Sequence, residues 1–151
     1  MILRWIFATL HLLALGIGLG AIVWRARSLR ANIDSDGIRR VLFSDNLWGL
    51  AAVLWISTGL VRAFGGLEKG SAYYLNNNVF WIKMTLLVLI LLLEIWPAIT
   101  FIRWRIQMAR SQTINFAPEL PQRLASISMV QSALIVAMIF TATALARGLG
   151  F

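Results

Sequence analysis

The sequence contains no cysteine and a single histidine among its 151 residues. Without thiols the chain can form no disulfide bond, no iron–sulfur cluster and no thiolate metal site. His11 is therefore the one imidazole that each chain can offer to a metal ion. These absences leave few kinds of metal centre open to the chain.

Charged residues are also scarce, at 13% of the sequence compared with about 25% in ordinary soluble domains. Apolar residues take their place, since 60% of the chain is hydrophobic and the mean hydropathy is +0.78. The net charge of +8 would suggest nucleic-acid binding in a soluble protein. No nucleic-acid module is recognisable here, and the arginines gather at the ends of apolar runs. We therefore expect the lipid bilayer and anionic lipid headgroups as partners, and no nucleic acid.

Four apolar runs are long enough to cross a membrane. The one at residues 79–102 holds only two charges, Lys83 and Glu94, and spans roughly 36 Å as a helix, against a hydrocarbon layer of roughly 30 Å. The sequence therefore predicts an all-α protein, a four-helix transmembrane bundle that runs up-down-up-down as a single integral membrane domain over residues 1–151. The expected helices cover about residues 5–24, 47–64, 79–102 and 124–146.

The expected connections cover residues 25–44, 65–78 and 107–122. Ser44 or Asp45 is expected to cap the second helix, because each offers a side-chain oxygen to the free N–H groups of the first turn. The first run is interpreted as a membrane helix and not as a signal peptide, since several arginines follow it closely.

Basic residues in the connections predict the orientation. The first and third connections carry most of the arginines, so they are expected to be cytoplasmic, with both termini and the second connection outside. Small residues along 124–146 let membrane helices approach closely, and they predict a homo-oligomer.

Three polar side chains are expected at one depth in the bilayer. His11 lies six residues into the first helix, roughly 9 Å from its start, and Lys83 lies four residues into the third, roughly 6 Å. Arg62 lies near the end of the second helix, on the same side of the membrane. The only imidazole and these two cations therefore share one leaflet.

A second polar layer is expected towards the other side. Glu94 and Gln131 lie at similar depth in the third and fourth predicted helices, so they can meet. Lys83 and Glu94 are separated by about three helical turns and share a helix face. Because charges within membranes usually face the bundle interior, this face is expected to be the inner one.

The first layer has two interpretations. In one, His11 is an axial ligand of a haem, Lys83 and Arg62 pair with the propionates, and Gly18 leaves room for the flat macrocycle. The second axial ligand would then be a methionine (Met84, Met129 or Met138), His11 of a second copy, or nothing. In the other, His11 makes an interhelical hydrogen bond, the two cations extend towards water, and the glycines serve close packing.

Glu94 also has two interpretations. It could relay protons or coordinate a transported cation, or it could be a protonated, hydrogen-bonded packing residue. The sequence alone leaves both open.

Three stretches carry a resemblance to a known family. They are HLLALGIGLGAIVWRARSLR, LWGLAAVLWISTGLVRAFGGLEKG and YYLNNNVFWIKMTLLVLILLLEIWPAITFIRWR. Together they closely resemble a family of small bacterial four-helix membrane proteins without assigned function. The resemblance covers nearly the whole chain and implies a multi-pass protein of the bacterial inner (plasma) membrane.

The chain is more distantly similar to the membrane protoporphyrinogen oxidases of the HemJ type, which bind haem b, and to CopD-type copper-resistance domains. In those oxidases a histidine early in the first helix and a lysine at the start of the third form the functional pair. His11 and Lys83 match these places, whereas Glu94 to Pro97 replace a histidine-bearing segment. The resemblance implies a haem site at His11. Copper handling has less support, because one histidine and scattered methionines are a poor copper set.

Two functional hypotheses follow. The first is a haem- or porphyrin-binding redox protein, related to oxidoreductases, with His11 on the iron. The second is a non-catalytic membrane scaffold or small transporter that needs no cofactor and whose polar layers are structural.

Overall fold

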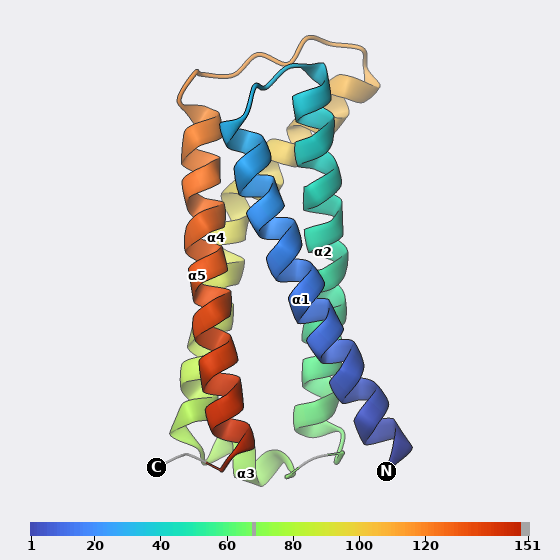
Figure 1. Ribbon diagram of the computed structural model, residues 1–151, viewed down its shortest axis with the longest axis vertical. Coiled ribbons are helices and arrows are strands. Elements are labelled where there is room, and N and C mark those ends of the chain that lie inside the picture. The colour runs from blue at the N-terminus through green and yellow to red at the C-terminus, as the bar shows by residue number, and fades with distance from the viewer. Residues whose placement is uncertain (68, 149–151) are drawn as a thin grey trace.

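Four long helices lie side by side and a fifth, short helix lies at one end (Figure 1). The computed structural model describes residues 1–67 and 69–148. The helices are α1 (Ile2–Arg30), α2 (Ser35–Phe64), α3 (Ser71–Leu75), α4 (Asn78–Ala109) and α5 (Leu120–Ala146).

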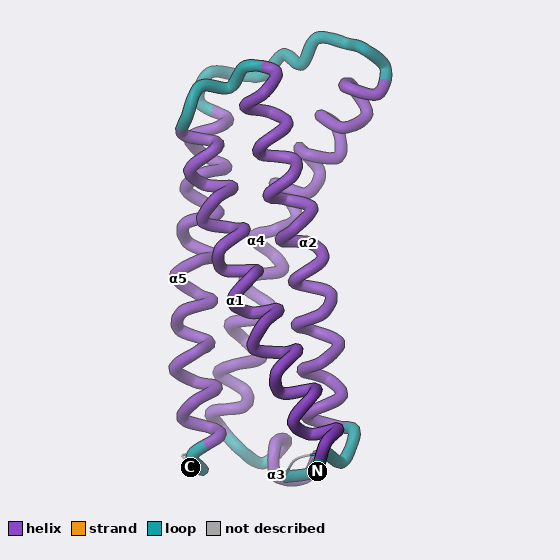
Figure 2. The backbone as a smooth tube through the Cα atoms, turned by 45° about the vertical axis from the view of Figure 1, so that its right-hand side comes forward, coloured by secondary structure: helices purple, strands orange, loops and turns teal. Residues whose placement is uncertain are grey.

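The predicted four-helix transmembrane bundle is confirmed. All four long helices are long and apolar enough to cross a membrane. They alternate in direction, so the amino-terminus, α3 and the end of α5 lie at one end of the bundle, here named the terminal end (Figure 2). The connections at 31–34 and 110–119 lie at the opposite end, here named the loop end.

The helices at the loop end are longer than the sequence predicted. Helix α1 continues from 24 to Arg30, and α2 begins at Ser35 and not at 47. The predicted cap at Ser44 or Asp45 is wrong, because Asp34 caps α2 by accepting a hydrogen bond from the Gly37 amide at 2.7 Å. Hydropathy marks where a helix leaves the hydrocarbon, whereas the backbone hydrogen bonds continue beyond the lipid.

Similar extensions occur in the other long helices. Helix α4 runs on to Ala109 and α5 begins at Leu120, each several residues beyond the predicted run. The second predicted connection, residues 65–78, contains the short helix α3.

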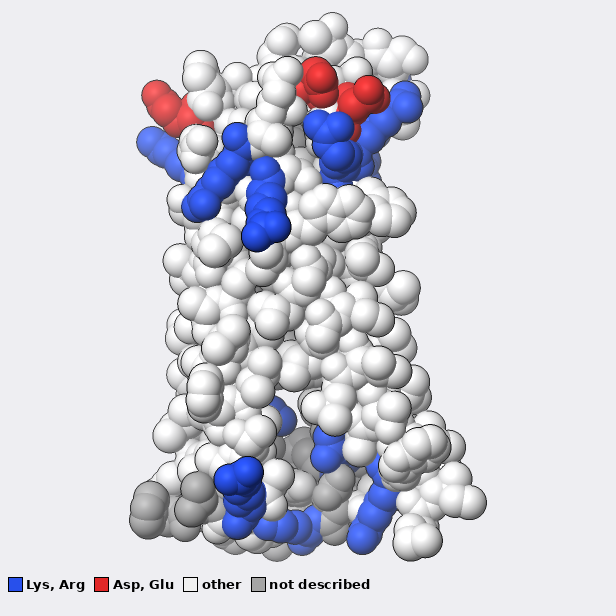
Figure 3. Space-filling model, viewed as in Figure 1, with Lys and Arg blue, Asp and Glu red and all other residues white. Residues whose placement is uncertain are grey.

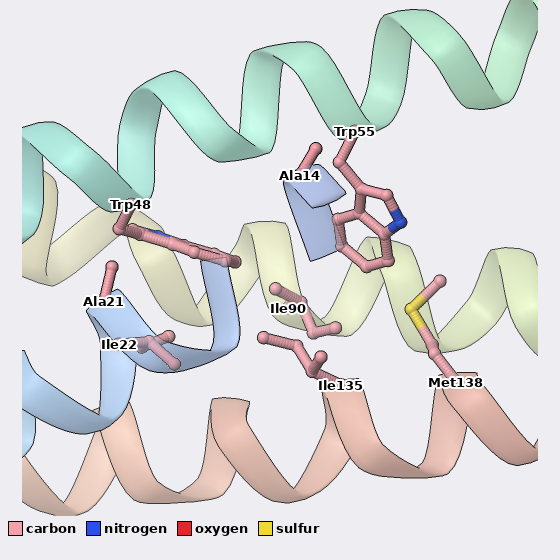
Figure 4. Packing of buried hydrophobic residues seen from close by; sticks show 8 residues of the cluster. All are labelled: Ala14, Ala21, Ile22, Trp48, Trp55, Ile90, Ile135 and Met138. Atoms are coloured by element: carbon pink, nitrogen blue, oxygen red, sulfur yellow. The ribbon is translucent and has the colours of Figure 1, made fainter. Parts of the chain in front are cut away.

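A cluster of apolar side chains fills the middle of the bundle (Figure 4). Trp48 and Trp55 of α2 extend inward towards Ile90 of α4 and Ile135 of α5, and all four are nearly inaccessible. Helix α1 packs along α2 and α5, and α4 packs along α5. The core therefore joins all four long helices at mid-depth.

Gly18 belongs to this packing and not to a cofactor site. A Cβ atom at Gly18 would lie 3.2 Å from the Trp48 ring and 3.4 Å from the Ala51 Cβ atom. The expectation that Gly18 leaves room for a macrocycle is wrong, because the Trp48 indole already occupies that space. A Cβ atom added at Gly16 or Gly20, by contrast, would meet nothing within 4 Å, and both glycines face outward.

This contrast predicts different effects of the same substitution. Gly18→Leu is expected to destabilise the bundle by about 1–3 kcal/mol, because the new side chain must displace Trp48 from a packed core. Gly16→Leu is the matched control and is expected to be near neutral. Thermal unfolding in detergent measures both, and equal stability of the two variants would contradict the assigned packing.

Candidate functional site

Arg25 is the centre of a buried ion-pair cluster that the sequence did not predict. Its side chain is completely buried. One terminal nitrogen donates to Asp45 Oδ1 at 2.8 Å and to Glu94 Oε1 at 2.7 Å. The other donates to Glu94 Oε2 and to Gln131 Oε1, both at 2.9 Å. Nε donates to Ser128 Oγ at 3.0 Å, so all five guanidinium donors are used.

The expected second polar layer is part of this cluster. Gln131 Nε2 donates to Glu94 Oε2 at 2.7 Å and to the Ile90 carbonyl at 3.1 Å. The structure thus brings Glu94 and Gln131 together, and it adds Arg25 between them. We name the side chains of this group the Arg25 cluster: Arg25, Asp45, Glu94, Arg105, Ser128 and Gln131.

The charges of the Arg25 cluster balance. Arg105 donates to Asp45 Oδ2 at 2.7 Å, so two arginines face two carboxylates. The members come from α1, α2, α4 and α5. Within the described chain, no buried side-chain nitrogen or oxygen lacks a hydrogen-bond partner. Pairing and hydrogen bonding offset the cost of burying these charges, and loss of one partner would leave a buried charge uncompensated.

A cavity of about 370 Å³ lies towards the terminal end. His11, Arg62 and Lys83 all line it, so the structure brings together the three side chains expected in the first polar layer. Figure 3 shows a hollow in the lower part of the molecule, with basic side chains in and beside it. Most of the lining surface is apolar, with Trp55, Leu87 and other core residues at its inner end.

His11 is held in a defined orientation. Its Nδ1 lies 3.0 Å from Thr58 Oγ1, and the Thr58 hydroxyl lies 2.6 Å from the Leu54 carbonyl. Because Thr58 donates its only proton to that carbonyl, it accepts from His11 Nδ1–H. The neutral imidazole then carries its lone pair on Nε2, the nitrogen that could bind a metal or accept a proton.

Gly59 makes room for this imidazole, a role that no pattern in the sequence indicates. A Cβ atom at Gly59 would lie 3.1 Å from His11 Cε1. The Trp55 ring of the same helix also lies near the imidazole, with ring centroids 6.2 Å apart. One turn of α2, from Trp55 to Gly59, therefore contacts the ring and bonds it through Thr58.

Lys83 has no hydrogen-bond or ion-pair partner within the described residues, although its ammonium group lines the cavity. Lys69, another lining cation, lies over the Tyr73 ring at 4.5 Å and donates to its hydroxyl at 3.2 Å. None of the described lining residues is acidic. Among the described residues, the cavity lining is therefore mostly apolar and carries cationic side chains.

Possible metal ligands in the cavity are few. Within residues 1–67 and 69–148, no three His, Asp or Glu side chains gather in a way that could hold a metal ion. Met84 and Met138 line the cavity together with His11, whereas Met129 is 40% exposed and does not. The donor set is thus one imidazole and two thioethers, which suits a metal already held by a prosthetic group.

Comparison with known proteins gives a family and no activity. No significant match to the chain was found among curated proteins or among solved structures. Residues 3–150 match the family described as predicted membrane proteins, DUF2214. Since the match covers nearly the whole sequence, the chain belongs to the DUF2214 family of predicted membrane proteins.

Proposed function

We propose that the protein is a membrane haem or porphyrin protein with a redox role, and that its cavity holds haem b. In this proposal His11 would bind the haem iron, and Lys83 and Arg62 would bind the propionates. The observation that carries the proposal is the ammonium group of Lys83, which lies without a described partner in the same apolar cavity as His11. A cation in such a site is costly unless an anion joins it.

The residues present fit a haem in four ways. The hydrogen bond through Thr58 leaves the His11 Nε2 lone pair for the iron. The cationic side chains suit the propionates, and the mostly apolar lining of the cavity suits the macrocycle. Met84 or Met138 is available as a second ligand. When bound, haem iron supplies one-electron chemistry, while the chain's own residues bind, orient and shield the group.

The second candidate function is a non-catalytic scaffold or small transporter. The Arg25 cluster favours a scaffold, because its donors and acceptors are paired and tie four helices together. A relay or cation site at Glu94 would have to break two hydrogen bonds to the Arg25 guanidinium. For Glu94 we therefore prefer the packing role.

We also propose the orientation and assembly expected from the sequence. Arginines concentrate at the loop end, which then lies in the cytoplasm of a bacterial inner membrane. The cavity and both termini would lie towards the outside. Gly16 and Gly20 on the outer face of α1 give a second copy room for close approach.

Haem binding is tested by the absorbance of protein purified from haem-replete cells. We expect a Soret band and a positive pyridine haemochrome assay, both lost in His11→Ala. Ser57→Ala, a change on the exposed side of α2, is the control and should keep the colour. Colourless wild-type protein, or an unchanged band in His11→Ala, would contradict the proposal.

A further inference from the structure

We infer that the cavity opens sideways into the bilayer between α1 and α5, and that its ligand is an anionic amphiphile that enters from the lipid leaflet. This inference concerns the same cavity and rests on the proposed function for the need of an anionic ligand. It adds the route and the physical class of the ligand: an apolar body that dissolves in the membrane and a negatively charged head.

The opening follows from how α1 and α5 diverge. At the loop end the two helices are joined by the hydrogen bond from Arg25 Nε to Ser128 Oγ. Towards the terminal end they separate both in the ribbon of Figure 1 and in the backbone tube of Figure 2. The buried side chains of α1 begin only at His11, so its first two turns have no tight packing partner.

The hollow lies on the face that carries α5 and α1 (Figure 3). Both helices contribute to the cavity lining, with Ala8 and Leu12 from α1 and Ile139 and Ala142 from α5. Apolar side chains beside it are exposed, with Leu12 at 63% and Phe140 at 72%. In a membrane these side chains contact acyl chains, so the hollow faces lipid.

The cavity is also deep enough for an apolar chain or ring system. Its lining on α5 runs from Met138 to Ala146, nine residues that span about 12 Å along the helix axis. Met138 marks the apolar inner end, and Lys69 and Lys83 supply positive charge. An amphiphile that lies with its head towards the terminal end therefore matches both the charge and the polarity of the lining.

The test is photocrosslinking in nanodiscs with a fatty acid that carries a diazirine near the end of its chain. We expect adducts on Met84 and Leu87, which line the cavity, measured by mass spectrometry relative to adducts on the exposed Ile82 and Leu89 of the same helix. Lys83→Gln should lower the cavity adducts about tenfold, because the carboxylate of the fatty acid loses its charged partner. The adducts on the lipid-facing residues should not change.

The route is tested by narrowing the opening. Ala8→Trp and Ala142→Trp should slow the appearance of cavity adducts, whereas Thr85→Trp, at an exposed position of α4 in the same leaflet, should not. A short, water-soluble diazirine carboxylate should give no cavity adducts. Labelling by that probe, or equal rates in all tryptophan variants, would overturn entry from the leaflet.

The readout separates this inference from haem binding. Cavity adducts that depend on Lys83 in a protein without a Soret band would support the amphiphile route and contradict haem. A Soret band in a protein whose cavity the fatty acid does not label would support haem and overturn the amphiphile route.

Discussion

Arg25→Ala is expected to cost about 3–5 kcal/mol of unfolding free energy, enough to prevent stable accumulation of a small membrane protein. The substitution would leave the Glu94 carboxylate buried without the two hydrogen bonds that it accepts from the guanidinium, and Asp45 would lose one of its two arginines. Thermal unfolding and expression level in the membrane fraction measure the loss.

Two further variants make this prediction specific. Arg27→Ala removes the same charge from an exposed position of α1 and should be near neutral. Adding Glu94→Gln to Arg25→Ala removes the buried carboxylate that has lost its cation, so the double variant should recover part of the lost stability. Two results would contradict this role of the cluster. One is an equal melting temperature for Arg25→Ala and Arg27→Ala, and the other is a double variant that is no more stable than Arg25→Ala alone.

Lys83→Gln is expected to weaken binding of both haem and iron-free protoporphyrin by about tenfold, since each carries carboxylates that would lose a charged partner. His11→Ala should weaken haem binding alone, because the iron-free ring has no metal for the imidazole to hold. Spectroscopic titration of the purified apoprotein with each ligand separates the two roles.

The control for Lys83→Gln is Arg4→Gln. Arg4 lies at the same end of the molecule, is exposed and does not line the cavity, so its substitution changes the overall charge equally. Equal losses in both variants would mean that long-range attraction, and not an ion pair in the cavity, favours the ligand. Because Lys83 has no described partner to lose, the variant should remain folded.

The bundle was predictable because long apolar runs leave few alternatives, but Arg25 was not. In the sequence alone, an arginine directly after an apolar run indicates the end of a membrane span. Residues 25–44 are therefore predicted to be a connection. What buries Arg25 is the pairing with Asp45 and Glu94, 20 and 69 residues away. One feature of the sequence could have indicated this pairing. Asp45 adjoins an apolar run and Glu94 interrupts one, so each carboxylate needs a nearby cation.

The cavity was predictable in part for a similar reason. Depth along a helix follows from residue counting, so the common level of His11, Arg62 and Lys83 could be predicted. The residues that fill the space beside these three could not be predicted, because their positions depend on helix rotation and on side-chain direction. Gly18 is an example. The space beside its Cα atom is occupied by the Trp48 ring, and Gly18 does not line the cavity.

The Arg25 cluster also bears on how the chain is made. Arg25 is synthesised long before its partner Gln131, 106 residues later, and before Ser128 on the same helix. Until α5 enters the bilayer, the guanidinium lacks two of its acceptors and α1 lacks one of its two flanking helices. A nascent chain that ends before α5 is therefore left incomplete at its most polar point, so the Arg25 cluster can close only after α5 has emerged from the ribosome.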